Sequence, residues 1–123
     1  FANIAQSMSG LYADGMALTN SVIGYGVPTS IGIEETFSNL NATADRLSKM
    51  ADVGYEIYAY EVLHTTQAMD MRKRDGKQMG QGTTKLLDGY RKVVPFVTKD
   101  RIFTPDINTG LKFLKSYQIP ANN

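Results

Sequence analysis

The chain has 123 residues, of which 42% are hydrophobic and 20% charged, a balance that excludes a disordered or fibrous polypeptide. Thirteen lysines and arginines against twelve acidic residues leave a net charge of +1, which gives no reason to expect a nucleic acid or an anionic membrane as partner. The absence of cysteine excludes disulfides, thiolate metal sites and a cysteine nucleophile and is compatible with the cytoplasm, and no apolar run approaches the roughly 20 residues that cross a bilayer.

The first predicted element is a helix over about residues 2–21. Its apolar residues recur mainly at helical spacing: Ile4, Met8, Leu11, Tyr12 and Leu18. Gly10 and Gly15 each weaken an isolated helix by about 1 kcal/mol relative to alanine, which favours close packing of another helix. The chain begins at Phe1, without a methionine and directly in this pattern, so we expect the downstream piece of a longer polypeptide. A loop rich in glycine follows at 24–32.

A single long helix is predicted over about residues 40–72, where there is one glycine and no proline. At about 1.5 Å per residue it forms a rod of roughly 50 Å, whereas a globule of this chain length has a radius of gyration of about 14 Å. Residues 57–63 are apolar nearly all round, which indicates burial on several sides. We therefore expect helices from outside this chain to cover the rod.

Two shorter helices complete the predicted all-α fold, which we interpret as a segment of a long-helix bundle. A polar, glycine-rich connection over 72–82 leads to a helix over about 83–94, which Pro95 ends. The last helix is expected to begin with Thr104 as N-cap and Pro105 at the first helical position. Its apolar face carries Ile107, Leu111 and Leu114.

Most groups of residues in the chain that could form a metal, phosphate or catalytic site are better explained by structural roles. Glu61-x-x-His64 is half of a di-iron helix motif, but the chain has only one histidine, so we predict no metal. The stretch 76–85 lacks the spacing of a phosphate loop and reads as a solvated connection. The pair Glu34-Glu35 has two interpretations. These acids either complement the dipole at a helix N-terminus or project from a rigid scaffold into a cavity.

An ordered series of short motifs resembles one enzyme family. Val27-Pro28-Thr29-Ser30 followed by Ile33-Glu34-Glu35 resembles the I-P-T-S-x-x-Q-E-D segment of histidine ammonia-lyases. A-Y-E-V-L at 59–63 and Q-A-M-D-M-R at 67–72 are similar to the A-I-E-L-L and Q-A-L-D-L-R of the same family. Further matches are Ile4-Ala5-Gln6, Tyr90-Arg91, Val94-Pro95, Asp100-Arg101 and Pro105-Asp106-Ile107. The chain thus resembles the aromatic amino acid ammonia-lyase and aminomutase family, with histidine ammonia-lyase as the nearest member.

The resemblance implies a helical homotetramer whose active sites combine residues of several subunits. It also implies a methylidene-imidazolone electrophile, which forms in this family from an internal Ala-Ser-Gly. This chain has no Ala-Ser-Gly, and its one Ser-Gly pair, Ser9-Gly10, follows Met8. Residues 1–123 therefore correspond to the C-terminal helical segment, roughly the last quarter of such an enzyme. The electrophile would come from the N-terminal part as partner, and the substrate would be a small amino acid.

Glu34 is the predicted catalytic residue, since it matches the active-site glutamate of histidine ammonia-lyases. A carboxylate accepts a hydrogen bond from an imidazole N–H or an ammonium group and exchanges protons with either. Relatives that act on phenylalanine or tyrosine usually carry glutamine there, so Glu34 favours histidine. Ile33, the second candidate substrate-binding residue, stands where glutamine is usual, while Glu35 and Thr36 replace aspartate and histidine.

Three functions stay open at this point. The first is a lyase that converts an aromatic amino acid into an α,β-unsaturated acid, with Glu34 at the substrate and with four structural polar residues on the long helix: Glu61, Gln67, Asp70 and Arg72. The second is an aminomutase on the same scaffold. The third is a helical assembly subunit without a site of its own.

Overall fold

The computed structural model describes residues 4–22 and 39–118. Within these ranges it consists of four α-helices and has no strand: α1 (Ile4–Leu18), α2 (Leu40–Arg74), α3 (Gln81–Arg91) and α4 (Thr104–Ser116). The predicted all-α class is confirmed, and each predicted helix is present with bounds that differ by three residues or fewer. None of the described helices combines the length and the apolarity that a membrane span requires.

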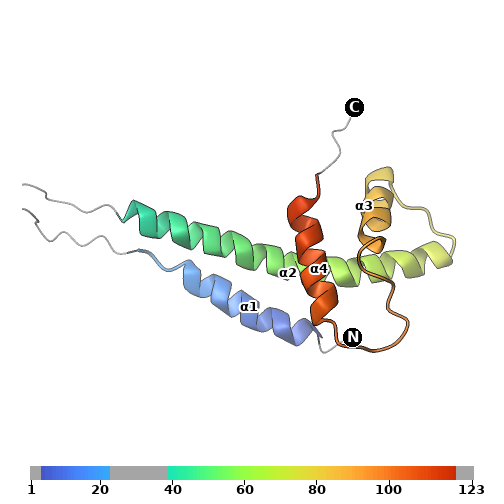
Figure 1. Ribbon diagram of the computed structural model, residues 1–123, viewed down its shortest axis with the longest axis horizontal. Coiled ribbons are helices and arrows are strands. Elements are labelled where there is room, and N and C mark those ends of the chain that lie inside the picture. The colour runs from blue at the N-terminus through green and yellow to red at the C-terminus, as the bar shows by residue number, and fades with distance from the viewer. Residues whose placement is uncertain (1–3, 23–38, 119–123) are drawn as a thin grey trace, which may run out of the picture.

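Helix α2 runs along the whole length of the part that the structure describes (Figure 1) and contains 35 residues, which corresponds to about 52 Å of helix. Its last turn carries three basic side chains, Arg72, Lys73 and Arg74, which the negative end of the helix dipole favours. The Asp75 N–H donates to the Met71 carbonyl at 3.1 Å, and Gly76 then turns the chain with a φ of +75°. Residues with side chains rarely adopt this conformation, so glycine is the natural terminator here.

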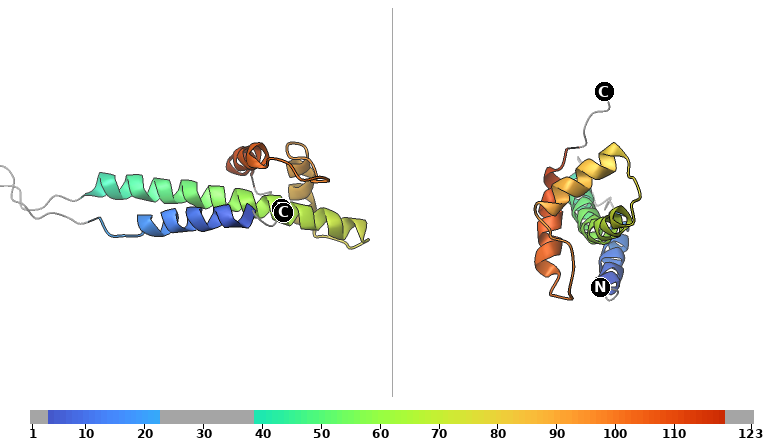
Figure 2. Two further views of the ribbon diagram at one scale, coloured as in Figure 1. Left: turned by 90° about the horizontal axis from the view of Figure 1, so that it is seen from below. Right: turned by 90° about the vertical axis from the view of Figure 1, so that its right-hand side faces the viewer.

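Helix α1 lies antiparallel beside the first half of α2 (Figures 1 and 2). The contact is close at Gly15, where a Cβ atom would lie 3.4 Å from Cγ1 of Val53. Gly10, by contrast, has nothing within 4 Å of such an atom. The predicted role of glycine in close helix packing is therefore confirmed for Gly15, while for Gly10 it stays a prediction.

The core lies where α4 and the segment after α3 meet the second half of α2 (Figure 2). Leu63, Tyr90 and Val94 have no exposed surface, and Phe103 retains only 8%. Partly buried side chains surround them: Ile4, Val62, Val97, Ile107 and Phe113. Since this cluster draws on all four helices or their flanks, it fixes how α1, α3 and α4 sit on α2.

Helix α4 begins one residue earlier than its predicted cap implied. Phe103 occupies the N-cap position and Thr104 is already helical, so the prediction of Thr104 as cap is wrong, while Pro105 lies in the first turn as predicted. Proline suits this turn because the first N–H groups of a helix have no intrahelical partner. The apolar face is partly buried as expected, but its only fully buried position is Gly110, which contacts the Tyr90 ring.

The first half of α2 is covered on one side only. Leu40 and Leu47 are 70% and 66% exposed, and Tyr58 is 59% exposed although Ala59 beside it is fully buried. Burial of residues 57–63 on several sides, by helices from outside this chain, therefore stays a prediction. The chain's own helices cover one arc of α2 and leave large apolar side chains on the other.

Candidate functional site

The predicted site residues Glu34 and Ile33 lie outside the described residues, as do Glu35 and Thr36. The structure describes the two points from which their segment departs, the end of α1 and the start of α2, which lie at the same end of the helix pair (Figure 1).

Short polar contacts define both of these points. The Thr19 hydroxyl donates to the Met16 carbonyl at 2.7 Å, which closes the last turn of α1. The Thr43 N–H and hydroxyl donate to the Asn39 carbonyl at 2.9 and 3.0 Å, which closes the first turn of α2. The Arg46 guanidinium of α2 then donates to the carbonyl of Asn20, just after α1. The two helix ends between which Glu34 lies in the sequence are thus joined by a direct contact.

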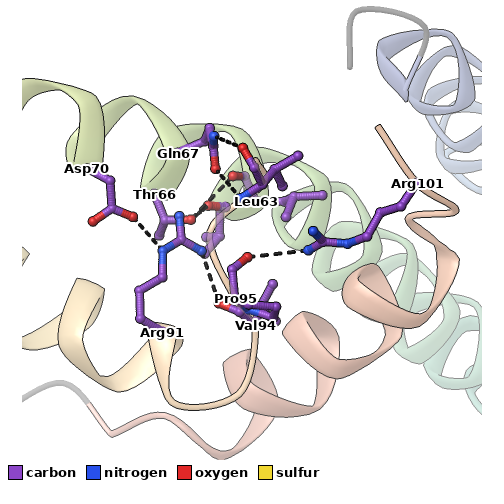
Figure 3. A network of polar contacts seen from close by, with 10 residues as sticks. Leu63, Thr66, Gln67, Asp70, Arg91, Val94, Pro95 and Arg101 are labelled. Carbon is purple, nitrogen blue, oxygen red and sulfur yellow. Dashed lines mark hydrogen bonds and ion pairs between the residues drawn. The ribbon is translucent and has the colours of Figure 1, made fainter. Parts of the chain in front are cut away.

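A second set of polar contacts holds the segment between α3 and α4 against α2 (Figure 3). The Gln67 side-chain amide makes a two-way contact with the backbone of Val97. Its Nε2 donates to the carbonyl at 2.9 Å, and its Oε1 accepts from the N–H at 3.1 Å. Arg101 adds a contact at the other end of the segment, where Nη2 lies 3.4 Å from the Pro95 carbonyl. A backbone stretch without secondary structure thereby gains partners that a helix would have supplied.

The ion pair between Asp70 and Arg91 lies beside this segment. Nε of Arg91 donates to Oδ2 of Asp70 at 2.5 Å, and Nη1 donates to the Val94 carbonyl at 3.1 Å. The two side chains are only 16% and 20% exposed, and Nη2 of Arg91 is buried without a hydrogen-bond partner among the described residues. The predicted structural roles of Gln67 and Asp70 are confirmed by these contacts.

The other two polar residues predicted as structural, Glu61 and Arg72, differ from Gln67 and Asp70. Glu61 and Arg72 are both exposed on this chain, so their role stays a prediction about the assembly. His64 is half-buried, and its Nδ1 lies 2.8 Å from the Tyr60 carbonyl of the preceding turn. In the described ranges no three histidine, cysteine or acidic residues gather where they could hold a metal ion.

Sequence reasoning missed an open cleft of about 340 Å³ between the start of α1, the middle of α2 and the start of α4. Its lining combines apolar and polar side chains: Ile4, Ser7, Tyr60, Asp100, Arg101, Phe103, Thr104 and Ile107. The Arg101 charge is compensated by Asp106, whose Oδ2 lies 2.9 Å from Nε. No sequence motif joins these residues, because they come from three separate parts of the chain.

The fold lowers the acidity of Tyr90. Burial raises its pKa to about 12 from the usual 10.0, and in the described part of the chain its hydroxyl has no hydrogen-bond partner. Burial has this effect because it disfavours the charged phenolate. Tyr90 is therefore a neutral core residue near pH 7 and cannot act there as a general base.

Comparison with known proteins decides the family. The pattern of the family described as aromatic amino acid lyase matches residues 1–92, three quarters of the chain. The chain belongs to the aromatic amino acid lyase family. The matched range includes positions 33 and 34, which lie between α1 and α2 in the sequence.

The chain is also similar to individual members of the aromatic amino acid lyase family. The chain is 34% identical over 100 residues to a histidine ammonia-lyase of Pseudomonas fluorescens, a match that covers 78% of this chain and 19% of that protein. It is 37% identical over 59 residues to one of Halalkalibacterium halodurans, which covers 48% of this chain and 11% of that protein. The match to one of Chloroflexus aurantiacus is 28% identical over 117 residues and covers 89% of this chain and 22% of that protein.

The chain thus spans between 11% and 22% of the length of these three relatives. No solved structure matches it. What a complete aromatic amino acid lyase of this kind does therefore rests on inference from the segment in hand.

Proposed function

We propose that this chain is the C-terminal part of an ammonia-lyase that acts on an aromatic amino acid, with histidine favoured. In the reaction the Cα–N bond breaks, a proton leaves Cβ, and the products are ammonia and an α,β-unsaturated acid. The observation that carries the proposal is the family match over residues 1–92, which spans the segment of Glu34. That three relatives bear the name histidine ammonia-lyase supports the choice of substrate.

Glu34 is the catalytic group that we assign to this chain. A carboxylate at this position accepts a hydrogen bond from the imidazole N–H or the ammonium group of histidine, and it takes or returns a proton. The contact between Arg46 and Asn20 supports this role, because it joins the two helix ends that flank Glu34 in the sequence. Ile33 beside it would contact the substrate through apolar surface.

The residues of this chain do not supply the electrophile of the family. A methylidene-imidazolone forms from Ala-Ser-Gly, and this sequence does not contain that tripeptide. Ser9-Gly10 follows Met8 in the interior of α1, where the backbone is held by helical hydrogen bonds. We therefore assign the electrophile to an N-terminal part of the same enzyme. In this proposal the assembled enzyme is a cytoplasmic homotetramer.

The test is a product assay of the assembled enzyme with histidine, phenylalanine and tyrosine as alternative substrates. We expect the highest kcat/KM for histidine, with ammonia and unsaturated acid released in equal amounts. A β-amino acid formed without free ammonia would identify an aminomutase instead. Absence of turnover in a chain that assembles with no electrophile-bearing polypeptide would identify a non-catalytic helical subunit.

A further inference from the structure

An aspartate directly before a glycine occurs three times in the chain, in three different structural surroundings. The pairs are Asp14-Gly15, Asp75-Gly76 and Asp88-Gly89, and the sequence has no Asn-Gly pair. In such a pair the glycine nitrogen can attack the aspartate carboxyl group, because glycine has no Cβ that shields the nitrogen or restricts the backbone. The attack requires the peptide between the two residues to rotate, so the fold decides which pair reacts.

Two of the pairs lie inside helices and are held there. Asp14-Gly15 belongs to α1 and Asp88-Gly89 to α3, where the backbone N–H groups make helical hydrogen bonds. Each glycine also packs against another helix, since an added Cβ would lie 3.4 Å from Val53 of α2 at Gly15 and 3.4 Å from the Phe113 ring of α4 at Gly89. Rotation of either peptide would break helical hydrogen bonds and displace a packed side chain.

The third pair lies where α2 has ended and the chain turns toward α3 (Figure 1). Asp75 is the C-cap with a ψ of 8°, and Gly76 follows with a φ of +75°. Both residues are exposed, and apart from its chain neighbours no described atom lies within 4 Å of a Cβ added at Gly76. The Gly76 N–H donates to the Lys73 carbonyl at 3.1 Å. A hydrogen bond at a helix end opens at a much smaller free-energy cost than one inside a packed helix.

We propose that Asp75 forms a succinimide with the backbone nitrogen of Gly76 and converts by this route to isoaspartate. The Gly76 nitrogen bonds to Cγ of Asp75, while the proton of that nitrogen, one carboxylate oxygen and one proton from solvent leave as water. Water then adds to one of the two ring carbonyl groups. Addition at Cγ restores aspartate, whereas addition at the backbone carbonyl carbon leaves the chain running through the side chain, as isoaspartate. The net change is an isomerisation that consumes no oxidant or reductant.

Isoaspartate would alter the turn that ends α2. It adds one carbon atom to the backbone between the N–H groups of Asp75 and Gly76, which donate to carbonyls of the last turn of α2 at 3.1 Å each. Arg74 in that turn lies over the Phe96 ring, 4.0 Å from its centroid. We therefore expect the modification to loosen the end of α2 and its contact with the segment before α4. The inference makes no use of Glu34 or of the proposed reaction.

The experiment follows isoaspartate in the full chain within its assembly, during several weeks at neutral pH. Chymotrypsin, which cleaves after Met71 and Met79, keeps Asp75 inside one peptide, and electron-transfer dissociation distinguishes isoaspartate from aspartate of the same mass. We expect isoaspartate to form at position 75 at least about tenfold faster than at positions 14 and 88, because opening a packed helix costs more than opening its end. In urea, where no helix protects a pair, the three rates should be similar.

The variant Asp75→Asn makes the test sharper. Its side-chain amide is uncharged and loses ammonia when the ring closes, so it reacts faster than the carboxylate does. We expect Asp75→Asn to deamidate at least about tenfold faster than the matched variant Asp88→Asn in α3, where helical bonds and the Phe113 contact hold the glycine. Asp75→Glu keeps the charge but would have to close a six-membered ring, so the product at this position should disappear.

Three results would overturn the proposal. The first is an equal rate of isoaspartate formation at positions 14, 75 and 88 in the folded chain. The second is a folded chain without isoaspartate at position 75 after the sample in urea has formed it at all three positions. The third is an Asp75→Asn variant that keeps its amide as long as Asp88→Asn does.

Discussion

The contact between Gly110 of α4 and Tyr90 of α3 leads to a sharp stability prediction. An added Cβ at Gly110 would lie 2.9 Å from Oη and 3.3 Å from Cε2 of the tyrosine, inside the roughly 3.5–4.0 Å of normal contacts. Tyr90 is fully buried with its ring edge-on to Phe113, at 5.5 Å between centroids and 80°, so it has little room to move. Overpacking of this kind costs about 1–3 kcal/mol, while alanine gains about 1 kcal/mol over glycine in a helix. We expect Gly110→Ala to lower the free energy of unfolding by about 1 kcal/mol.

Urea unfolding, monitored by far-UV circular dichroism, measures this change in the free energy of unfolding. The matched control is Gly10→Ala in α1, where nothing lies within 4 Å of the new methyl group, and we expect a gain of up to about 1 kcal/mol there. Tyr90→Phe removes the nearest atom, so in that background Gly110→Ala should recover at least about 1 kcal/mol, a coupling that a double-mutant cycle detects. The steric reasoning is refuted if Gly110→Ala stabilises the chain as Gly10→Ala does.

Three further predictions concern the polar contacts and the buried hydroxyl. Asp70→Asn should lower the free energy of unfolding by about 2–3 kcal/mol in urea titration, somewhat less than for a fully buried pair, because it leaves the charge of Arg91 largely uncompensated. Gln67→Leu should cost about 2 kcal/mol by the same measurement, since both backbone groups of Val97 lose their partner. Raising the pH from about 10 to about 12 should lower the free energy of unfolding by up to about 2–3 kcal/mol through Tyr90. The Tyr90 hydroxyl ionises at its usual pKa of 10.0 in the unfolded chain, but only near 12 in the folded chain, where burial raises its pKa. Tyr90→Phe should remove this part of the alkaline loss.

Each of these three stability predictions has its own control variant. Asp52→Asn breaks the exposed pair with Lys115 and should leave the unfolding curve unchanged, and an equal loss for both aspartates would argue against burial as the cause. Gln67→Glu keeps an acceptor for the Val97 N–H but loses the donor to its carbonyl, so its effect should fall below that of Gln67→Leu. If Tyr90→Phe and the wild type lose stability equally between pH 10 and 12, Tyr90 does not carry the alkaline effect.

The helices could be predicted because their determinants are local. The apolar spacing and the absence of proline between Leu40 and Arg72 indicate one long helix, and Pro95 indicates where the preceding helix ends. The exact N-cap of α4 was missed, because Thr104 is a favourable cap by residue type while the packing of Phe103 in the core decides the start of the helix.

The polar contacts could not be predicted, because they join residues far apart in the chain. Gln67 meets Val97 thirty positions later, and Asp70 meets Arg91 twenty-one positions later. The hydrophobic pattern of the sequence identifies Gln67 and Asp70 as polar positions on α2. It does not show how the segment before α4 crosses that helix. Gly110, a small residue within an amphipathic helix, was the available sign of a close neighbour.

The candidate site could be predicted only through the resemblance of short motifs. Composition and spacing allowed two interpretations of Glu34, an acid at a helix N-terminus or a functional carboxylate. The order of the motifs along the chain favoured the functional carboxylate. The family match over residues 1–92 confirms the resemblance, while the role of Glu34 stays a prediction. The exposure of Leu47 on α2 shows a further limit, since periodicity reveals an apolar stripe but not which chain covers it.

The most direct test of the proposed function is kcat/KM for histidine in the assembled enzyme with Glu34→Gln, beside the matched variant Glu35→Gln. Glutamine keeps the size of the side chain and removes the charge and the ability to exchange a proton, so we expect a loss of about a hundredfold or more at Glu34. The loss at Glu35 should be much smaller. Unchanged turnover of histidine in Glu34→Gln would contradict the assignment of this carboxylate to the active site.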